Sequence, residues 1–170
     1  MAAGKSTVGR ALAGLLHWTC VDLDCEIERS CGLPIHQIFA RLGEPHFRKL
    51  EAEVLSSVLR KTSRAKVIAL GGGTLAQPQN ASLLTDAGAR VVFLEVPVEE
   101  LLRRCAAARD RYNPRPLAGD DAAFCALYAE RLPRYREAHL TVDAAGKTAE
   151  EIAREIAAAL RLAEAVGPDL

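Results

Sequence analysis

Apolar residues follow two kinds of spacing along this chain. They recur every three or four positions in some segments, which is typical of helices, and they form short unbroken runs in others, which is typical of buried strands. The runs predict strands near Thr19, Val67, Val91 and Leu140. Helical spacing is found at about residues 5–17, 34–42, 45–60, 80–87, 97–107, 121–130 and 148–163. Because strands alternate with helices throughout, we predict an α/β fold of three αβα layers, with a parallel sheet and helices on both faces.

Turn and capping residues mark where several of these helices begin and end. Pro34 fits the first turn of one helix, Gly43 ends that helix, and Pro45 starts the next one. Thr148 is in the right place to cap the last helix. Residues 23–60 are therefore predicted to form a helical insert between two strands.

The composition is that of one folded domain. The chain has 170 residues, of which 49% are hydrophobic and 26% charged. Lys plus Arg and Asp plus Glu both total 22, so no overall charge favours nucleic acid or an acidic membrane. No apolar run approaches the length of a membrane span. The odd number of cysteines, without a Cys-x-x-Cys pair, predicts reduced thiols in the cytoplasm that act as packing residues. They are Cys20, Cys25, Cys31, Cys105 and Cys125.

The segment Gly4-Lys5-Ser6-Thr7 matches the end of a phosphate-binding loop. The full pattern is a glycine, any four residues, and then Gly-Lys-Ser or Gly-Lys-Thr; backbone N–H groups surround the phosphates, the lysine reaches the outer ones, and the hydroxyl binds Mg²⁺. The first glycine would fall before Met1, so a flexible tail is the alternative. The helical pattern that follows favours the phosphate loop, because a helix amino terminus attracts anions. The candidate nucleotide contacts are Ala2, Ala3, Gly4, Lys5, Ser6 and Thr7.

Two carboxylates stand at the end of the first predicted strand. In open α/β sheets, ligands bind beyond the carboxyl ends of the strands, so Asp22 and Asp24 are candidates for metal or substrate contact. The alternative is that one of them only caps the helix that begins near Cys25. Two acids at alternate positions, in a chain that also has a phosphate loop, favour the functional interpretation.

Arg48 and Glu51 lie three residues apart, on one face of a predicted helix. Glu51 can therefore orient the Arg48 guanidinium, although this spacing alone is more typical of a solvated ion pair on a helix surface. Gly71–Gly73 follow a short apolar strand and predict either a tight turn or the close approach of a ligand to the backbone.

The polar segment at residues 108–121 contains several arginines together with Pro114, Pro116 and Gly119. It is predicted to be a loop. Its arginines are either a solubilising surface or part of a lid that brings one of them to a transferring phosphate.

Taken in order, six motifs resemble those of shikimate kinases. They are the phosphate loop, Asp22-Leu23-Asp24, Phe47-Arg48, the triple glycine, Arg115-Pro116-Leu117 and Arg131-Leu132-Pro133-Arg134-Tyr135. The similarity extends from Met1 to the last helix. It implies one kinase domain over residues 1–170, with an insert at 23–60 and a lid at 108–121, and a fold like that of nucleoside-monophosphate kinases. It also implies transfer of the γ-phosphate of ATP to the 3-hydroxyl of shikimate, in the biosynthesis of aromatic amino acids.

The resemblance implies a role for each matching residue on the nucleotide side. The phosphate loop holds ATP, and Ser6 and Asp22 hold Mg²⁺. Arg104 and Lys147 contact the adenine side of the nucleotide. The residues implied in catalysis are Lys5, Asp24 and Arg115.

On the substrate side, the resemblance implies that Arg48 and Arg131 bind the shikimate carboxylate. Asp24 binds the substrate hydroxyls and orients or deprotonates the attacking one. Among Gly71–Gly73, Gly72 offers its backbone to a substrate hydroxyl. A related kinase for another sugar acid, such as gluconate, is the alternative enzyme.

The amino-terminal end departs from the family pattern. Only four strands are found where the family has five, and the missing one is central and precedes the phosphate loop. We therefore expect the natural start to lie upstream of Met1. A second alternative follows from the incomplete loop, namely a catalytically weak protein that binds shikimate. The resemblance further implies a monomer without a nucleic-acid or membrane partner.

Overall fold

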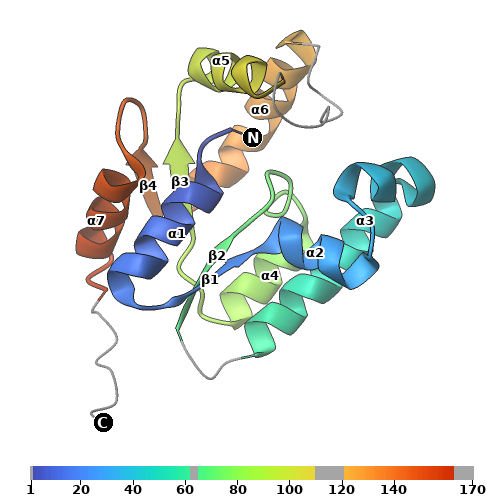
Figure 1. Cartoon of the computed structure of the whole chain (residues 1–170), viewed down its shortest axis with the longest axis horizontal. Coiled ribbons are helices and arrows are strands. Elements are labelled where there is room, and N and C mark those ends of the chain that lie inside the picture. Colours follow the sequence, from blue (N-terminus) through green and yellow to red (C-terminus); the bar gives the residue numbers. More distant parts are fainter. Residues whose placement is uncertain (1, 62–64, 110–120, 163–170) are drawn as a thin grey trace.

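The computed structural model describes residues 2–61, 65–109 and 121–162. Its helices and strands alternate along the chain as the sequence predicts (Figure 1). In chain order they are α1 (Lys5–Leu16), β1 (Thr19–Asp22), α2 (Leu23–Cys31), α3 (Ile35–Arg60), β2 (Lys66–Ala69), α4 (Pro78–Asp86), β3 (Val92–Glu95), α5 (Val98–Arg109), α6 (Asp121–Arg136), β4 (Leu140–Asp143) and α7 (Ala149–Ala159).

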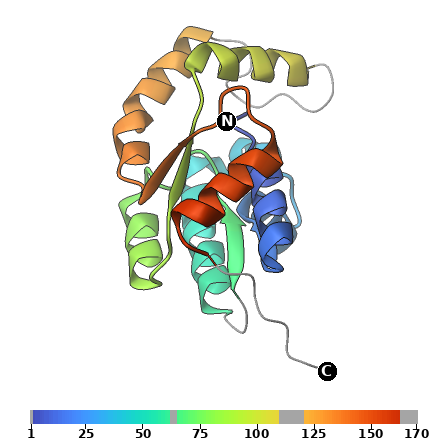
Figure 2. The ribbon, with the colours of Figure 1, turned by 90° about the vertical axis from the view of Figure 1, so that its left-hand side faces the viewer.

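The four strands of the described residues form two parallel pairs, and helices cover them on both sides. β1 pairs with β2, with Thr19 opposite Lys66, and β3 pairs with β4, with Val92 opposite Leu140. In Figure 2, α1 and α4 lie on opposite sides of the strands. The predicted α/β class with its parallel strands is therefore confirmed. Within the described residues, however, the strands form two separate pairs and not one continuous sheet.

An apolar cleft of about 540 Å³ lies between the two pairs of strands. Residues of both β2 and β3 line it, together with Val8 and Leu12 of α1 and Phe124 of α6. Because β2 and β3 each have one strand neighbour in the described residues, the backbone edge of each faces the cleft. The gap thus occurs in the middle of the strand array, where the sequence pattern predicts a missing strand.

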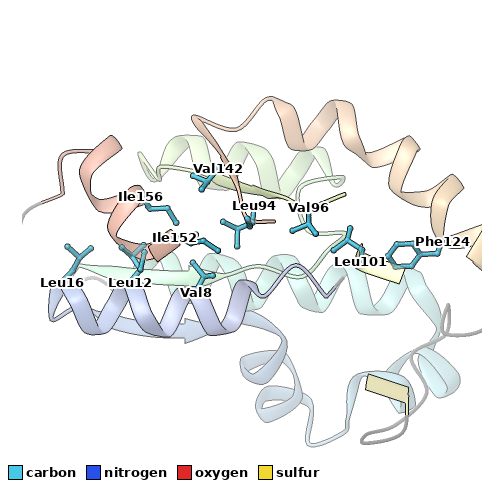
Figure 3. Packing of buried hydrophobic residues seen from close by; sticks show 12 residues of the cluster. Val8, Leu12, Leu16, Leu94, Val96, Leu101, Phe124, Val142, Ile152 and Ile156 are labelled. Atoms are coloured by element: carbon cyan, nitrogen blue, oxygen red, sulfur yellow. The ribbon is translucent and has the colours of Figure 1, made fainter. Parts of the chain in front are cut away.

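Two hydrophobic cores flank this cleft. The first joins α1, β3, β4 and the last three helices, and Figure 3 shows Leu12, Leu94 and Ile152 meeting in it. The second joins the helices of the insert to α4, with Leu23, Ile27 and Leu55 fully buried among its members. No helix among the residues described is long and apolar enough to cross a membrane.

Most of the predicted helix boundaries are confirmed by backbone geometry. Gly43 has φ of +79° and interrupts α3, so two helical segments meet at a kink there. Thr148 caps α7 and forms a reciprocal capping box with Glu151. The boundary expected near residue 130 is wrong, because α6 continues through Pro133 to its last turn. All five cysteines are free thiols, and the packing role is wrong for Cys25, which is exposed.

Candidate active site

The predicted site residues gather at the edge where the parallel strands end. The amino-terminal end of α1 and the loop after β2 both lie at this edge (Figure 1). Gly4 precedes α1 with φ of +81°, and its carbonyl accepts the first helical hydrogen bond, from Val8, at 2.9 Å. Lys5 is the first residue of the helix and lines the cleft. The free amides of this helix end and the lysine can therefore both face an anion.

Ser6 and Asp22 come together at this edge, although they are far apart in sequence. Ser6 Oγ donates a 2.5 Å hydrogen bond to Asp22 Oδ2. The other carboxylate oxygen, Oδ1, accepts from the backbone N–H groups of Asp24 at 3.1 Å and Cys25 at 3.4 Å. Asp22 is thus the N-cap of α2 and a partner of Ser6 at once, so the structural and the functional interpretations of this residue are compatible.

The glycine loop at Gly71–Gly73 is crowded by functional side chains. A Cβ atom built on Gly71 would lie 3.0 Å from Asp24 Oδ1, and one built on Gly73 would lie 2.7 Å from Arg48 Nη2. The loop also turns tightly, with the Thr74 N–H donating to the Gly71 carbonyl at 3.3 Å. Glycine is therefore needed here because a carboxylate and a guanidinium approach the backbone.

Glu51 is buried, and this makes the solvated-surface interpretation of the Arg48–Glu51 pair wrong. Glu51 is 1% exposed and binds Arg48 Nη1 at 3.0 Å through Oε2. Its Oε1 accepts a 2.7 Å hydrogen bond from the Thr74 hydroxyl, and the Asn80 amide lies 3.5 Å from Oε2. Burial opposes the charge on Arg48, but hydrogen bonds to Glu51 and Glu44 outweigh burial and raise the Arg48 pKa.

Arg131 lies on α6 and lines the cleft together with Gly72 and Tyr135. The Tyr135 hydroxyl donates a hydrogen bond to the Gly72 carbonyl, and the Arg131 guanidinium lies near the same hydroxyl. Burial raises the Tyr135 pKa, while the neighbouring Arg131 lowers it less. The structure thereby connects the second predicted arginine to the glycine loop.

The remaining predicted residues differ in what the structure shows. Arg104 contacts the phosphate loop, because its Nη1 donates to the Ala2 carbonyl at 3.4 Å while Glu100 binds Nη2 at 2.5 Å. Lys147 forms a 2.7 Å ion pair with Glu155 in the region where β4 leads into α7. Arg115 and residues 110–120 of the expected lid lie outside the described residues.

Three contributors to the site were not assigned a role from sequence. Thr74 directly follows the triple glycine. Tyr135 lies one helical turn after Arg131, so Tyr135 and Arg131 share one face of the helix. These spacings could have pointed to them. Asn80 had no signal, because its amide reaches the Thr74 carbonyl, at 3.1 Å, only in the folded chain.

These features together define a P-loop kinase that acts on a small molecule. The core is parallel α/β, and the amino terminus of its first helix carries a lysine and a serine. A carboxylate lies beside a glycine loop that arginines line. Comparison with known proteins gives the family. Residues 1–161 match the family described as shikimate kinase. A shikimate kinase from Geobacter metallireducens is 43% identical over 159 residues, which are 92% of this chain and 85% of the relative.

Solved structures agree with this assignment. A shikimate kinase from Acinetobacter baumannii, solved in complex with shikimate, superposes with a TM-score of 0.81 at 35% identity, covering 95% of this chain and 88% of that one. A shikimate kinase from Aquifex aeolicus gives a TM-score of 0.81 at 34% identity, covering 95% and 92%. The chain belongs to the shikimate kinase family and is an ATP-dependent kinase.

Proposed function

We propose that this chain transfers the γ-phosphate of ATP to the 3-hydroxyl of shikimate. The observation that carries the proposal is the approach of Asp24 and Arg48 to the same glycine loop, where each stands about 3 Å from an added Cβ atom. The Asp24 carboxylate can accept a hydrogen bond or a proton from a hydroxyl, and the Arg48 guanidinium can bind a carboxylate. A hydroxylated carboxylic acid is the class of substrate that uses both groups.

The proposed roles follow from these positions. Arg48, held by buried Glu51, binds the substrate carboxylate together with Arg131. Asp24 orients the attacking hydroxyl and accepts its proton, although phosphoryl transfer through a loose transition state demands little of a base. The loop backbone contacts the substrate hydroxyls, because its glycines carry no side chains of their own that would block the approach.

On the nucleotide side, residues 2–7 hold the phosphates and Lys5 neutralises charge on the transferring group. Arg115 contributes from the lid, and stabilisation of this kind is worth about 10³-fold or more in rate. Arg104, which already contacts Ala2, lies on the adenine side with Lys147. We place the protein in the cytoplasm as a monomeric single domain, and its five free thiols support that compartment.

The Ser6 hydroxyl and the Asp22 carboxylate fit a magnesium ion. Both offer hard oxygen atoms, and Mg²⁺ is usually held by one or two protein oxygens together with water and substrate phosphates. When bound, the ion neutralises phosphate charge. The 2.5 Å hydrogen bond between the two side chains keeps these oxygen donors together at the phosphate loop.

The test is ADP release by the purified chain with Mg²⁺ and ATP, with shikimate or gluconate as acceptor. We expect release with shikimate only, and a loss of at least about 100-fold in kcat for Asp24→Asn. Asp86→Asn is the matched control, because Asp86 is an exposed acid at the end of α4. Release with gluconate alone would overturn the choice of substrate. Calorimetric binding of shikimate without binding of ATP would instead identify a protein that only binds the substrate.

A further inference from the structure

One tyrosine hydroxyl joins two of the proposed substrate contacts. Tyr135 donates to the Gly72 carbonyl, and the Arg131 side chain lies close enough to the same hydroxyl to lower its pKa. A phenol has one proton and two lone pairs, so it can donate to a carbonyl and accept from a guanidinium at the same time. The same oxygen therefore sets the position of the glycine loop relative to Arg131.

The ring that carries this hydroxyl is itself fixed. Tyr135 packs against Phe93 of β3, with ring centroids 5.3 Å apart and planes inclined by 31°. This tilted contact is a favourable arrangement for two aromatic rings. The hydroxyl is thus held by a strand, a helix and a loop, and it has little freedom to move away from Gly72.

The opposite side of the loop is held in a comparable way. Glu51 binds Arg48 with one carboxylate oxygen and the Thr74 hydroxyl with the other. Each of the two arginines proposed to bind the substrate therefore lies beside a side chain that also bonds to Gly72 or Thr74. These contacts fix the distance between the two arginines, which are proposed to bind the substrate carboxylate, and the glycine-loop backbone, which is proposed to bind its hydroxyls.

We propose that Tyr135 is a positioning residue for the acceptor substrate. The tyrosine hydroxyl holds Arg131 and the Gly72 peptide apart by the distance that separates the carboxylate of the acceptor from one of its hydroxyl groups. This inference rests on the proposed function and adds a residue that does not itself react. Positioning of this kind affects acceptor binding and leaves the nucleotide site unchanged. Burial, which raises the Tyr135 pKa, helps to keep the hydroxyl protonated and able to donate.

The test compares Tyr135→Phe with Tyr128→Phe. Both variants keep the ring and remove one hydroxyl from α6; the Tyr128 hydroxyl donates to the Val96 carbonyl at 3.4 Å and has no described contact with the glycine loop. For Tyr135→Phe we expect a rise of about tenfold in KM for shikimate, a change of less than about threefold in kcat, and an unchanged KM for ATP. Tyr128→Phe should leave both KM values unchanged.

A double-mutant cycle provides a readout that a general loss of stability would not produce. In an Arg131→Ala background, Tyr135→Phe should raise KM for shikimate by much less than tenfold, because the two residues act together. Equal changes in KM for shikimate and ATP, or a full tenfold effect in the Arg131→Ala background, would overturn the proposal. Shikimate affinity measured by calorimetry gives the same comparison without turnover. Failure of the wild-type chain to phosphorylate shikimate would count against the proposed function separately.

Discussion

The guanidinium of Arg48 lies against the backbone of Gly73. A Cβ atom on this glycine would stand 2.7 Å from Nη2, 2.9 Å from Nη1 and 3.1 Å from Cζ of the arginine. Real Cβ atoms essentially never lie within 3.0 Å of another atom, so a side chain at position 73 would displace the guanidinium. The position of Arg48 therefore depends on the absence of a side chain 25 residues further along the chain.

We predict that Gly73→Ala weakens acceptor binding with little loss of stability. The displaced atoms are at the end of a flexible side chain, so the fold can accommodate the methyl group while Arg48 leaves its position. KM for shikimate should rise by about tenfold, which corresponds to the loss of one charge-assisted hydrogen bond. Gly14→Ala is the control, because Gly14 is exposed on α1 and an added Cβ meets no atom within 4 Å. An unchanged KM in Gly73→Ala would contradict the prediction.

Removal of the Glu51 carboxylate should destabilise the fold. Glu51→Ala leaves the partly buried Arg48 without its buried partner and takes the acceptor away from Thr74. We expect the free energy of unfolding to fall by about 3 kcal/mol, measured by urea denaturation. Glu53→Ala, two residues away, breaks a 4.0 Å pair with Lys49 on the exposed face and should cost less than about 1 kcal/mol. Equal losses in the two variants would show that burial of Glu51 has no special role.

The capping box of α7 predicts a pH-dependent contribution to stability. Hydrogen bonds from the Thr148 backbone and side chain lower the pKa of Glu151 below its ordinary value. A carboxyl whose pKa is lower in the folded state stabilises the fold above the unfolded-state pKa of about 4.3, and this stabilisation is lost as pH falls through the folded-state value. Wild type should therefore exceed Glu151→Gln in unfolding free energy at neutral pH, and the difference should shrink below about pH 4. Glu150→Gln, which leaves the box intact, should show no such trend.

Filling the cleft should stabilise the whole chain. We predict that an amino-terminal extension of five Val, Ile and Leu residues, followed by Gly-Ala before Met1, raises Tm by on the order of 10 °C. The extension supplies apolar side chains to the cleft of about 540 Å³ and backbone partners to β2 and β3, and it adds a glycine at the first position of the phosphate-loop pattern. An extension with two Asp residues within the apolar run should have no such effect. The same Tm for both extensions would show that the cleft does not accept a strand.

Much of the fold was predictable because local signals and fold signals agree. Gly43 breaks α3 through its backbone conformation, and Thr148 caps α7 through its hydroxyl, so both features can be recognised from a few adjacent residues. The gap between the two strand pairs of the described residues was also predictable, because a phosphate loop in this fold follows a central strand. The helix through Pro133 was not, since a proline usually ends or kinks a helix and only packing decides otherwise.

The residues of the site could be predicted from the sequence, but their burial and their contacts with one another could not. The Arg48–Glu51 spacing indicates a shared helix face but carries no information about burial, which depends on Thr74 and Asn80 from distant segments. Likewise, the sequence suggests a functional role and a capping role for Asp22 as alternatives. It could not show that Asp22 has both, because the contact with Ser6 exists only in the folded chain.

The division of the interior into two hydrophobic cores has a consequence for cooperativity. One core depends on β3, β4 and the helices that follow them, and the other depends on α2, α3 and α4. Since the cleft separates β2 from β3, backbone hydrogen bonds cannot transmit strain directly from one strand pair to the other. The α2–α4 half can then open while the other half stays folded, as an independent foldon that amide hydrogen exchange would reveal as a separate class of protection. Because Arg48 and the glycine loop belong to that half and Arg131 belongs to the other, such opening would separate the two arginines proposed to bind the acceptor.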